Sequence, residues 1–298
     1  MSPLAANDGL IVPSDDEVAA MVFDQFPALV GREIGRRYTM QDHVTVRIGD
    51  DYGVLMPIIP GQNHLYERVA GLLEPLLPTW TFPRSAPIAT GVPQGNFPYH
   101  FTLVPWLSGS TAAFVPLHGD SAPVVGDALR QLHGPTPESS PANPVTAVTL
   151  NSLQNDWRRL LSTTMASGAP ENRVLDAAKA DALWQAAAAT PLDAHTWTHG
   201  TLEPRAVLSD RGAFSGLLMW HRFGAGDPAA DLGYVANLFS LDDRAALLSG
   251  YGETSPETVA RAQGWQLLGA LRLIETGDPF LVRLAWERLI EFDVVSEG

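Results

Sequence analysis

The sequence predicts an α+β protein in which a β-rich first lobe is followed by a mostly helical second lobe. Apolar and polar residues alternate over residues 44–57 around a turn, which is typical of a β-hairpin. Beyond residue 121, most of the periodic segments follow the helical repeat instead. The chain has 298 residues, of which 45% are hydrophobic, and this is enough for one large core or for the cores of two lobes.

The elements of the first lobe can be placed in order along the chain. A helix is expected over 15–26, where apolar residues recur at helical spacing behind Ser14, a residue type that caps helix N-termini. The hairpin over 44–57 comes next. A second helix is expected over 62–77, and a strand over 100–107.

The second lobe is expected to be mostly helical. Its proline-rich segment 134–145 indicates a loop, and residues 205–210 and 214–219 indicate a short hairpin. Residues 195–199 should be extended, which keeps His195 and His199 too far apart to form a metal site. The helices are expected over 121–133, 151–165, 171–188, 228–240, 255–277 and 279–292.

Composition narrows the possible partners. The formal net charge is −14, which disfavours binding to nucleic acid and to anionic membrane surfaces. An acidic surface suits a cationic or polar small molecule, although such a surface also serves solubility alone. The sequence contains no cysteine, no long apolar run and no basic, apolar leader, so we expect a cytoplasmic protein without disulfides.

The most informative segment is 199–233, HGTLEPRAVLSDRGAFSGLLMWHRFGAGDPAADLG. It resembles the phosphotransfer core of the aminoglycoside phosphotransferase family, which includes macrolide and choline kinase relatives. That family carries a pattern close to HGDLHPGNVLVD, a short hairpin, a hydrophobic-Asp-aromatic triplet and GDPAxDL. Here His199-Gly200, Pro204, the hairpin and GDPAADL follow in the same order and spacing. The resemblance implies a bilobal protein-kinase-like fold.

The reactive positions of this motif differ from the family. The resemblance places Thr201 at the catalytic Asp, Ala206 at the metal-binding Asn and Met219 at the metal-binding Asp. Phosphoryl transfer needs a carboxylate to orient the attacking hydroxyl, and Mg²⁺ needs oxygen ligands. A neutral hydroxyl and two side chains without oxygen cannot supply them. The resemblance therefore implies a degenerate member with no metal and no cofactor.

The first lobe also resembles the family, and there too other residues stand at the functional positions. VRIGDDYGVLMPI resembles the strand that carries the basic residue for the nucleotide phosphates, and it places Leu55 there. The following helix places Val69 at the Glu that pairs with that basic residue. Losing both partners together avoids a stranded buried charge. The first hairpin region, 40–47, also lacks the glycines with which a backbone cradles phosphate.

Three further segments resemble the family. Residues 98–112 look like the hinge strand and the start of the second lobe, 129–133 like the end of its first helix, and 264–272 like a late helix. The resemblance thus implies an N-terminal β-rich lobe over 1–106 and a C-terminal helical lobe over 107–298, which carries the degenerate catalytic loop.

Several polar residues in or beside the motif are candidates for a site. Glu203, His221 and Arg222 stand where active relatives usually have other residues, and a Glu and a His on adjacent loops could perform acid–base work or bind a polar ligand. We expect Glu203 and His221 to be partly exposed. The alternative is a solvated loop face.

Other candidates would line the old cleft. His199 and Asp227 could do so, but hydrogen bonds that only hold the loop are the simpler interpretation, because buried polar groups are usually paired. Trp106 and Trp220 would border the cleft under the resemblance, although tryptophans most often pack in cores.

Three functions are compatible with these observations. The first is a pseudokinase that binds a small molecule, or a protein, in the old cleft. The second is a repurposed enzyme of specialised metabolism that uses the cleft for non-phosphoryl chemistry. The third is an atypical ATP-dependent small-molecule phosphotransferase, which the three replaced positions disfavour. The sequence does not separate the first two, because both imply the same lost residues, so it leaves open whether the protein is an enzyme.

Overall fold

The structure is a computed structural model and describes residues 9–40, 42–168, 173–192, 194–200 and 202–297. The chain divides into two compact units. The first comprises Met1–Ser108 together with Gly216–His221, and the second comprises Gly109–Ser215 together with Arg222–Gly298. The predicted division into 1–106 and 107–298 stays a prediction.

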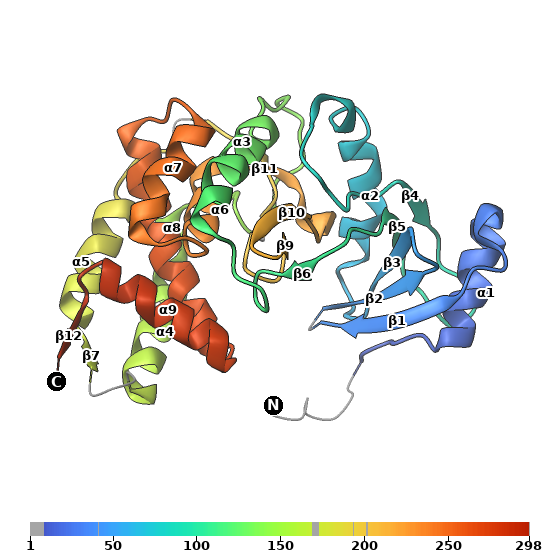
Figure 1. Cartoon of the computed structure of the whole chain (residues 1–298), viewed down its shortest axis with the longest axis horizontal. Coiled ribbons are helices and arrows are strands. Elements are labelled where there is room, and N and C mark those ends of the chain that lie inside the picture. The colour runs from blue at the N-terminus through green and yellow to red at the C-terminus, as the bar shows by residue number, and fades with distance from the viewer. Residues whose placement is uncertain (1–8, 41, 169–172, 193, 201, 298) are drawn as a thin grey trace. The chain divides into compact units, whose positions relative to one another are not determined.

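The first unit is built on an antiparallel five-stranded sheet with the order β1-β2-β3-β5-β4 (Figure 1). The predicted hairpin over 44–57 is present as β2 and β3. Strand β1 precedes it at the edge of the sheet and was not predicted, because its polar sequence, IGRRYT, lacks a clear apolar alternation. The strands are β1 Ile34–Thr39, β2 His43–Ile48, β3 Tyr52–Pro57, β4 Ala89–Gly91 and β5 Phe101–Pro105.

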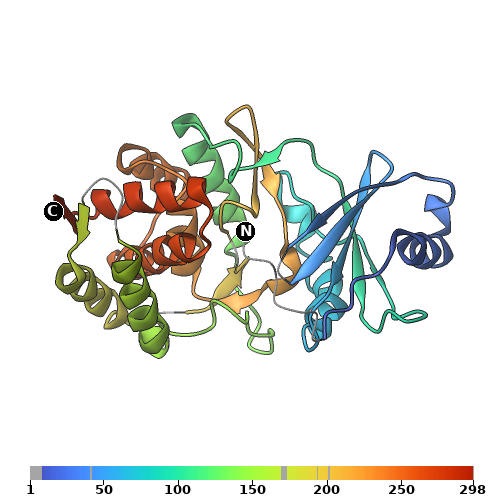
Figure 2. The same cartoon turned by 90° about the horizontal axis from the view of Figure 1, so that it is seen from below.

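Two helices cover the two faces of this sheet. Helix α1, Asp15–Gln25, begins with a capping box between Ser14 and Glu17 and packs Val18 and Val22 on the face that carries Val46. Because successive strand residues point to opposite faces, Leu55 lies on the other face, where it packs with helix α2, Asn63–Leu73. Figure 2 shows α1 in dark blue and α2 in cyan on either side of the blue strands.

The second unit is mostly helical, and α8 is its central helix. Every residue of α8 from Gly264 to Leu271 is buried, and α4, α5, α6 and α9 pack around it. Helices α3 and α7 pack against each other. The helices are α3 Ala122–Leu132, α4 Gln154–Ser167, α5 Ala177–Ala188, α6 Pro228–Ala236, α7 Leu241–Tyr251, α8 Pro256–Glu275 and α9 Pro279–Glu291.

Short strands connect these helices. The order β10-β9-β6 forms a three-stranded sheet, and β11-β8 and β12-β7 form two-stranded pairs. The predicted hairpin of the motif is present as β9 and β10. The strands are β6 Ser110–Thr111, β7 Arg173–Leu175, β8 Thr196–Thr198, β9 Val207–Asp210, β10 Ala213–Leu217, β11 Gly224–Gly226 and β12 Val295–Glu297.

Two helix predictions need correction. The segment expected to be helical over 171–188 begins its helix only at Ala177, because Arg173–Leu175 pairs with the C-terminal strand β12. The helix expected over 228–240 ends at Ala236. Ser240 instead caps a further helix, α7, by accepting a hydrogen bond from the Asp243 backbone N–H.

Candidate functional site

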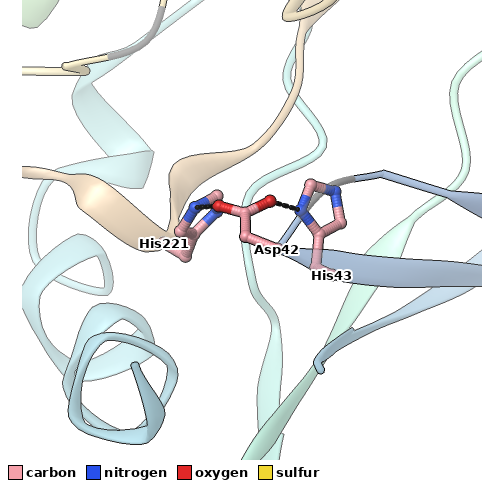
Figure 3. Close-up of side chains that lie close together, drawn as sticks. All are labelled: Asp42, His43 and His221. Atoms are coloured by element: carbon pink, nitrogen blue, oxygen red, sulfur yellow. Dashed lines mark hydrogen bonds and ion pairs between the residues drawn. The ribbon is translucent and has the colours of Figure 1, made fainter. Parts of the chain in front are cut away.

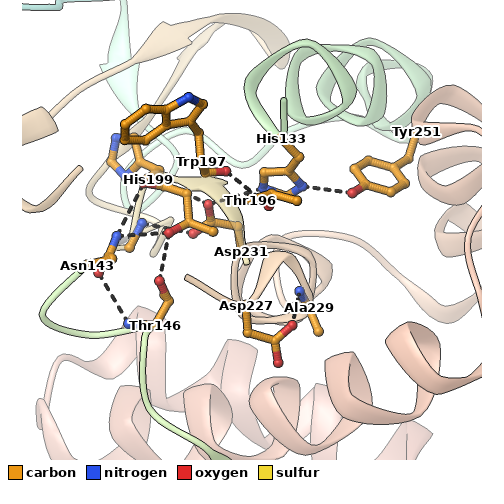
Figure 4. A network of polar contacts seen from close by, with 12 residues as sticks. His133, Asn143, Thr146, Thr196, Trp197, His199, Asp227, Ala229, Asp231 and Tyr251 are labelled. Atoms are coloured by element: carbon orange, nitrogen blue, oxygen red, sulfur yellow. Dashed lines mark hydrogen bonds and ion pairs between the residues drawn. The ribbon is translucent and has the colours of Figure 1, made fainter. Parts of the chain in front are cut away.

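The loop that contains His199 and Gly200 is held by a buried carboxylate. Asp231, in the first turn of α6, is fully buried, and its Oδ2 and Oδ1 accept hydrogen bonds from the backbone N–H groups of His199 at 2.6 Å and Gly200 at 2.9 Å (Figure 4). His133 Nε2 lies 3.3 Å from the same carboxylate, and the Nδ1 of that ring contacts the Tyr251 hydroxyl at 2.8 Å. Asp231 thus fixes the backbone of this loop.

A second buried polar side chain, that of Asn143, also holds this loop. Asn143 donates to the Thr198 carbonyl and hydroxyl at 3.2 and 3.0 Å, and Thr198 Oγ1 lies 2.7 Å from Thr146 Oγ1 (Figure 4). Gly200 has a φ of 91°, and a Cβ there would approach the Asn143 side chain to about 2.5 Å. Only glycine fits this left-handed position over the amide.

Asp227 has the contacts of a structural residue. Its Oδ1 accepts from the Ala229 N–H at 3.0 Å and so caps α6, and its Oδ2 accepts from Arg261 Nε at 2.9 Å. The side chains of Asp227 and Arg261 are 5% and 4% exposed. A buried pair of this kind positions a helix end, and breaking it would leave a charge without its partner.

The second unit contains a cavity beside this loop. Its volume is about 370 Å³, which is within the range of small-molecule sites. Two of the predicted candidates, Glu203 and Arg222, are part of its wall. The lining residues are Pro144, Val145, Val148, Leu153, Gly200, Glu203, Arg222, Tyr234 and Arg272.

Polar side chains in the wall of this cavity form hydrogen bonds with one another and with a neighbouring carboxylate. Arg272 donates to the Tyr234 hydroxyl and, at 3.0 Å, to Asp156. Burial is the largest effect on Tyr234 and raises its pKa to about 12. The Glu203 carboxylate adds to that increase, whereas Arg272 opposes it. The Tyr234 phenol is therefore neutral at physiological pH and acts as a hydrogen-bonding group rather than as a base.

The remaining candidates lie in the first unit, and one of them, His221, is more buried than expected. His221 was expected to be partly exposed on a loop face, but its side chain is only 2% exposed. It belongs to a short 3₁₀ turn, Trp220–Arg222, and its ring stacks on that of Tyr66 with centroids 5.0 Å apart. Trp220 is 1% exposed and stacks on Trp80, so it packs in a core.

Trp106, by contrast, is half-buried. Its ring lies 5.6 Å from that of Tyr38, and the Arg47 guanidinium lies 5.5 Å from the centre of the indole. Its surroundings are thus those of a cation–π contact on the sheet.

His221 meets two residues that the sequence reasoning missed. Asp42 Oδ1 lies 2.7 Å from His43 Nδ1, and Asp42 Oδ2 lies 3.6 Å from His221 Nε2, so the carboxylate stands between two imidazoles (Figure 3). Burial favours the neutral carboxyl, but the contacts with His221 and His43 outweigh it and hold the pKa of Asp42 well below its usual range. In the sequence, only the adjacency of Asp42 and His43 could have indicated this cluster.

The positions that the resemblance aligns with the reactive residues of the family are mostly apolar and buried. Leu55 packs with Leu65 and Tyr66, and Val69 is fully buried on the same helix. Ala206 is also fully buried, directly before β9. Met219 is half-buried with a φ of 62°, a left-handed conformation in which Asn and Asp are enriched over other non-glycine residues. Thr201 lies outside the described residues.

No helix among the described ranges of the chain is long and apolar enough to cross a membrane.

The comparison with protein families gives a match over most of the chain. The sequence pattern of the phosphotransferase enzyme family matches residues 58–265, which is more than half of the chain. A comparison with curated proteins finds no significant match.

Three solved structures are similar over nearly their whole length. Wild-type aminoglycoside 2'-phosphotransferase-IIIa, in its GDP complex, has a TM-score of 0.63 and 14% identity, over 94% of this chain and 98% of that one. Macrolide 2'-phosphotransferase MphH from Brachybacterium faecium, an apoenzyme, has a TM-score of 0.57 and 18% identity, over 92% and 97%. The gentamicin complex of APH(2")-IIa has a TM-score of 0.58 and 14% identity, over 95% and 96%. The expected kinase-like α+β fold is confirmed.

Proposed function

The chain belongs to the phosphotransferase enzyme family, and from that premise we propose that it is a member that binds a small molecule without transferring phosphate. The ligand would bind in the cavity of the second unit beside Glu203 and Arg222. The protein would thus be a pseudokinase that retains the concave site of its family without the phosphoryl chemistry.

The observation that carries this proposal is the chemistry of the positions at which the family holds phosphate and Mg²⁺. Ala206 and Met219 offer no oxygen ligand, and Thr201 offers no basic group. Leu55, which the resemblance places at the basic position that grips phosphate, is buried beside Leu65 and Tyr66. Without a cation, negative charge developing on a transferred phosphoryl group would not be neutralised.

A further observation concerns the first hairpin, where the family approaches phosphate with its backbone. Here Asp42 stands in the turn between β1 and β2 and His43 begins β2, where the family has glycines. A carboxylate in this turn repels a polyphosphate, whereas free backbone N–H groups would attract it. This adds an electrostatic penalty to the missing contacts.

The cavity itself supports a polar ligand. Glu203 supplies a carboxylate and Arg222 and Arg272 supply guanidinium groups, while Val145, Val148 and Leu153 supply an apolar wall. A few oriented polar groups against an apolar surface are typical of small-molecule sites. Glu203 can pair with a cationic or strongly polar group of the ligand, whereas Arg222 and Arg272 can donate to its acceptor groups.

The nucleotide part can be tested by thermal denaturation of the full chain, freed of transition metals, with Mg²⁺-ATP at millimolar concentration. A ligand at about a hundredfold excess over its Kd would stabilise the folded chain by about 2.7 kcal/mol. We expect no Mg²⁺-dependent shift of the melting temperature and no release of phosphate from ATP. A clear shift that needs both Mg²⁺ and ATP would refute the proposal.

The cavity part can be tested with gentamicin, a polycationic probe, by isothermal titration calorimetry. Glu203→Gln should weaken any binding at least about tenfold, which corresponds to about 1.4 kcal/mol. Glu253→Gln, at an exposed acidic residue remote in sequence, is the matched control and should bind as the unmodified chain does. If gentamicin does not bind, a wider set of polar amines is screened. Binding that Glu203→Gln leaves unchanged would exclude this cavity as its site.

A further inference from the structure

The cluster of Asp42, His43 and His221 has the composition of a metal site. The three side chains each present one ligand atom, and these atoms all lie within 4.8 Å of one another. Imidazole nitrogen and carboxylate oxygen are the ligands that Zn²⁺ and related divalent transition metals take in proteins. All three residues belong to the first unit, so the cluster does not depend on the cavity proposed above as the ligand site.

The spacing of these atoms is close to what a tetrahedral ion requires. Bonds of 2.0–2.1 Å place neighbouring ligand atoms of a tetrahedral Zn²⁺ site about 3.3 Å apart. The two observed separations, 2.7 Å from Asp42 Oδ1 to His43 Nδ1 and 3.6 Å from Asp42 Oδ2 to His221 Nε2, lie on either side of that value. An ion bound between the three side chains would replace the direct contacts of the carboxylate with the imidazoles.

The two imidazoles are held in place by the fold. His43 is the first residue of β2 and pairs with Pro57 of β3, and its carbonyl accepts from the Met40 N–H at 2.9 Å. The His221 ring lies nearly parallel to that of Tyr66, with an interplanar angle of 6°. Both imidazoles are almost fully buried, whereas the Asp42 side chain is 15% exposed. Ligands fixed in this way lose little freedom when an ion binds.

We propose that Asp42, His43 and His221 bind one divalent transition metal ion of the zinc class, with water as a fourth ligand. Two nitrogen ligands and a single carboxylate favour Zn²⁺ over Mg²⁺, because Mg²⁺ prefers an octahedral shell of oxygens. The ion would join the start of β2 to the segment Gly216–His221, which is far away in sequence but belongs to the same compact unit.

The test uses the full chain after treatment with EDTA, with Zn²⁺ alone as the probe. Isothermal titration calorimetry and elemental analysis should give one Zn²⁺ per chain, and Co²⁺ should give the intense visible absorption of a four-coordinate site. Zn²⁺ should also raise the melting temperature, whereas Mg²⁺ should not. Asp42→Asn, the mildest change of a ligand, should weaken binding by about 100-fold, which is at the upper end of losses from outer-shell changes.

His64 provides the matched control because it is an exposed histidine in the same unit, on α2. His64→Gln should bind Zn²⁺ as the unmodified chain does. His43→Gln and His221→Gln should abolish binding, and circular dichroism establishes whether each variant is folded. If either is not folded, Asp42→Asn alone decides. The proposal is overturned if the unmodified chain binds no Zn²⁺, or if Asp42→Asn binds Zn²⁺ as tightly as the unmodified chain does.

Discussion

At the scale of single residues, the Asp156 carboxylate binds two arginines, one of which belongs to the wall of the cavity in the second unit. It accepts hydrogen bonds from Arg159 at 2.7 Å and from Arg272 at 3.0 Å, and Arg272 lines the cavity. Burial raises the pKa of this carboxyl, but the two guanidinium groups outweigh burial, so its pKa lies below the ordinary value. The charged form is therefore favoured by folding.

The sign of the pH dependence follows from this lowered pKa. Asp156 contributes its full stability above its unfolded pKa, about 3.9, and that stability is lost as the pH falls through the lower folded value. Because the side chain is 30% exposed, solvent screening keeps the effect small. We expect Asp156→Asn to reduce the free energy of unfolding by about 1 kcal/mol at pH 7, and by much less near pH 2.

Chemical denaturation of the full chain at several pH values measures this difference. Glu138→Gln, at an exposed residue of the proline-rich loop, is the control and should leave the unfolding midpoint unchanged at every pH. A loss of stability in Asp156→Asn that is the same at pH 2 and pH 7 would mean that charge plays no part in it.

At the scale of elements, the β9–β10 hairpin has a turn whose conformation and sequence disagree. Its two turn residues, Arg211 and Gly212, have φ values of 51° and 91°. Positive φ at both positions is the type I′ turn, which Asn-Gly fits best, whereas arginine is strained there. Arg211 is also 92% exposed and has little packing to lose.

We therefore expect Arg211→Asn to raise the free energy of unfolding by about 0.5–1 kcal/mol, as a gain in thermal stability. The control is Arg158→Asn, at an exposed position inside α4, where asparagine should instead destabilise the helix by a few tenths of a kcal/mol. Equal effects of the two substitutions would argue against turn strain as the cause.

A second element-scale prediction concerns the close approach of α3 and α7. A Cβ at Gly250 would lie 2.1 Å from the Pro123 carbonyl oxygen, which is backbone and cannot swing away. Gly250→Ala should therefore separate the helices and cost about 1–3 kcal/mol.

Gly71→Ala in α2 is its matched control, because a Cβ there meets nothing within 4 Å. That change should raise the melting temperature slightly, since alanine favours the helix by up to about 1 kcal/mol. Thermal denaturation compares the two variants directly. Similar small effects at both positions would mean that α3 and α7 tolerate separation.

At the scale of the whole molecule, the chain returns to its first unit late in the sequence. Trp220 is 1% exposed there, and its ring stacks on Trp80 and Phe82 with centroids 5.3 and 6.3 Å away. A fragment of residues 1–108 lacks this side chain. We expect the fragment to lack the near-ultraviolet circular dichroism of fixed aromatic packing.

The same contact can be tested in the intact chain. Trp220→Ala should cost about 3–5 kcal/mol because it removes a large buried side chain, whereas the half-buried Trp106 should cost less when replaced by alanine. If fragment 1–108 unfolds cooperatively and Trp220→Ala is nearly neutral, the returning segment is not needed by the first unit.

The prediction of a cytoplasmic location stays a prediction.

The sequence by itself determined the features that depend on neighbouring residues. Ser14 predicted the start of α1, apolar alternation predicted the β2–β3 hairpin, and the order of motifs in 199–233 predicted the family. These signals are local, because caps, turns and periodicity act over a few residues. Strand β1 was missed because its local signal was weak. Helix α7 was missed because the local signal at its start was assigned to the neighbouring helix.

Only the tertiary structure decided which distant side chains meet. His221 was expected on a loop face but is buried against Asp42. The buried Asp231 accepts a hydrogen bond from the backbone N–H of His199. The tertiary structure also placed Glu203 in the wall of the cavity of the second unit and assigned His221 to the first unit. The physical reason is that burial and pairing of polar groups depend on packing between segments far apart in the chain, which local patterns do not encode.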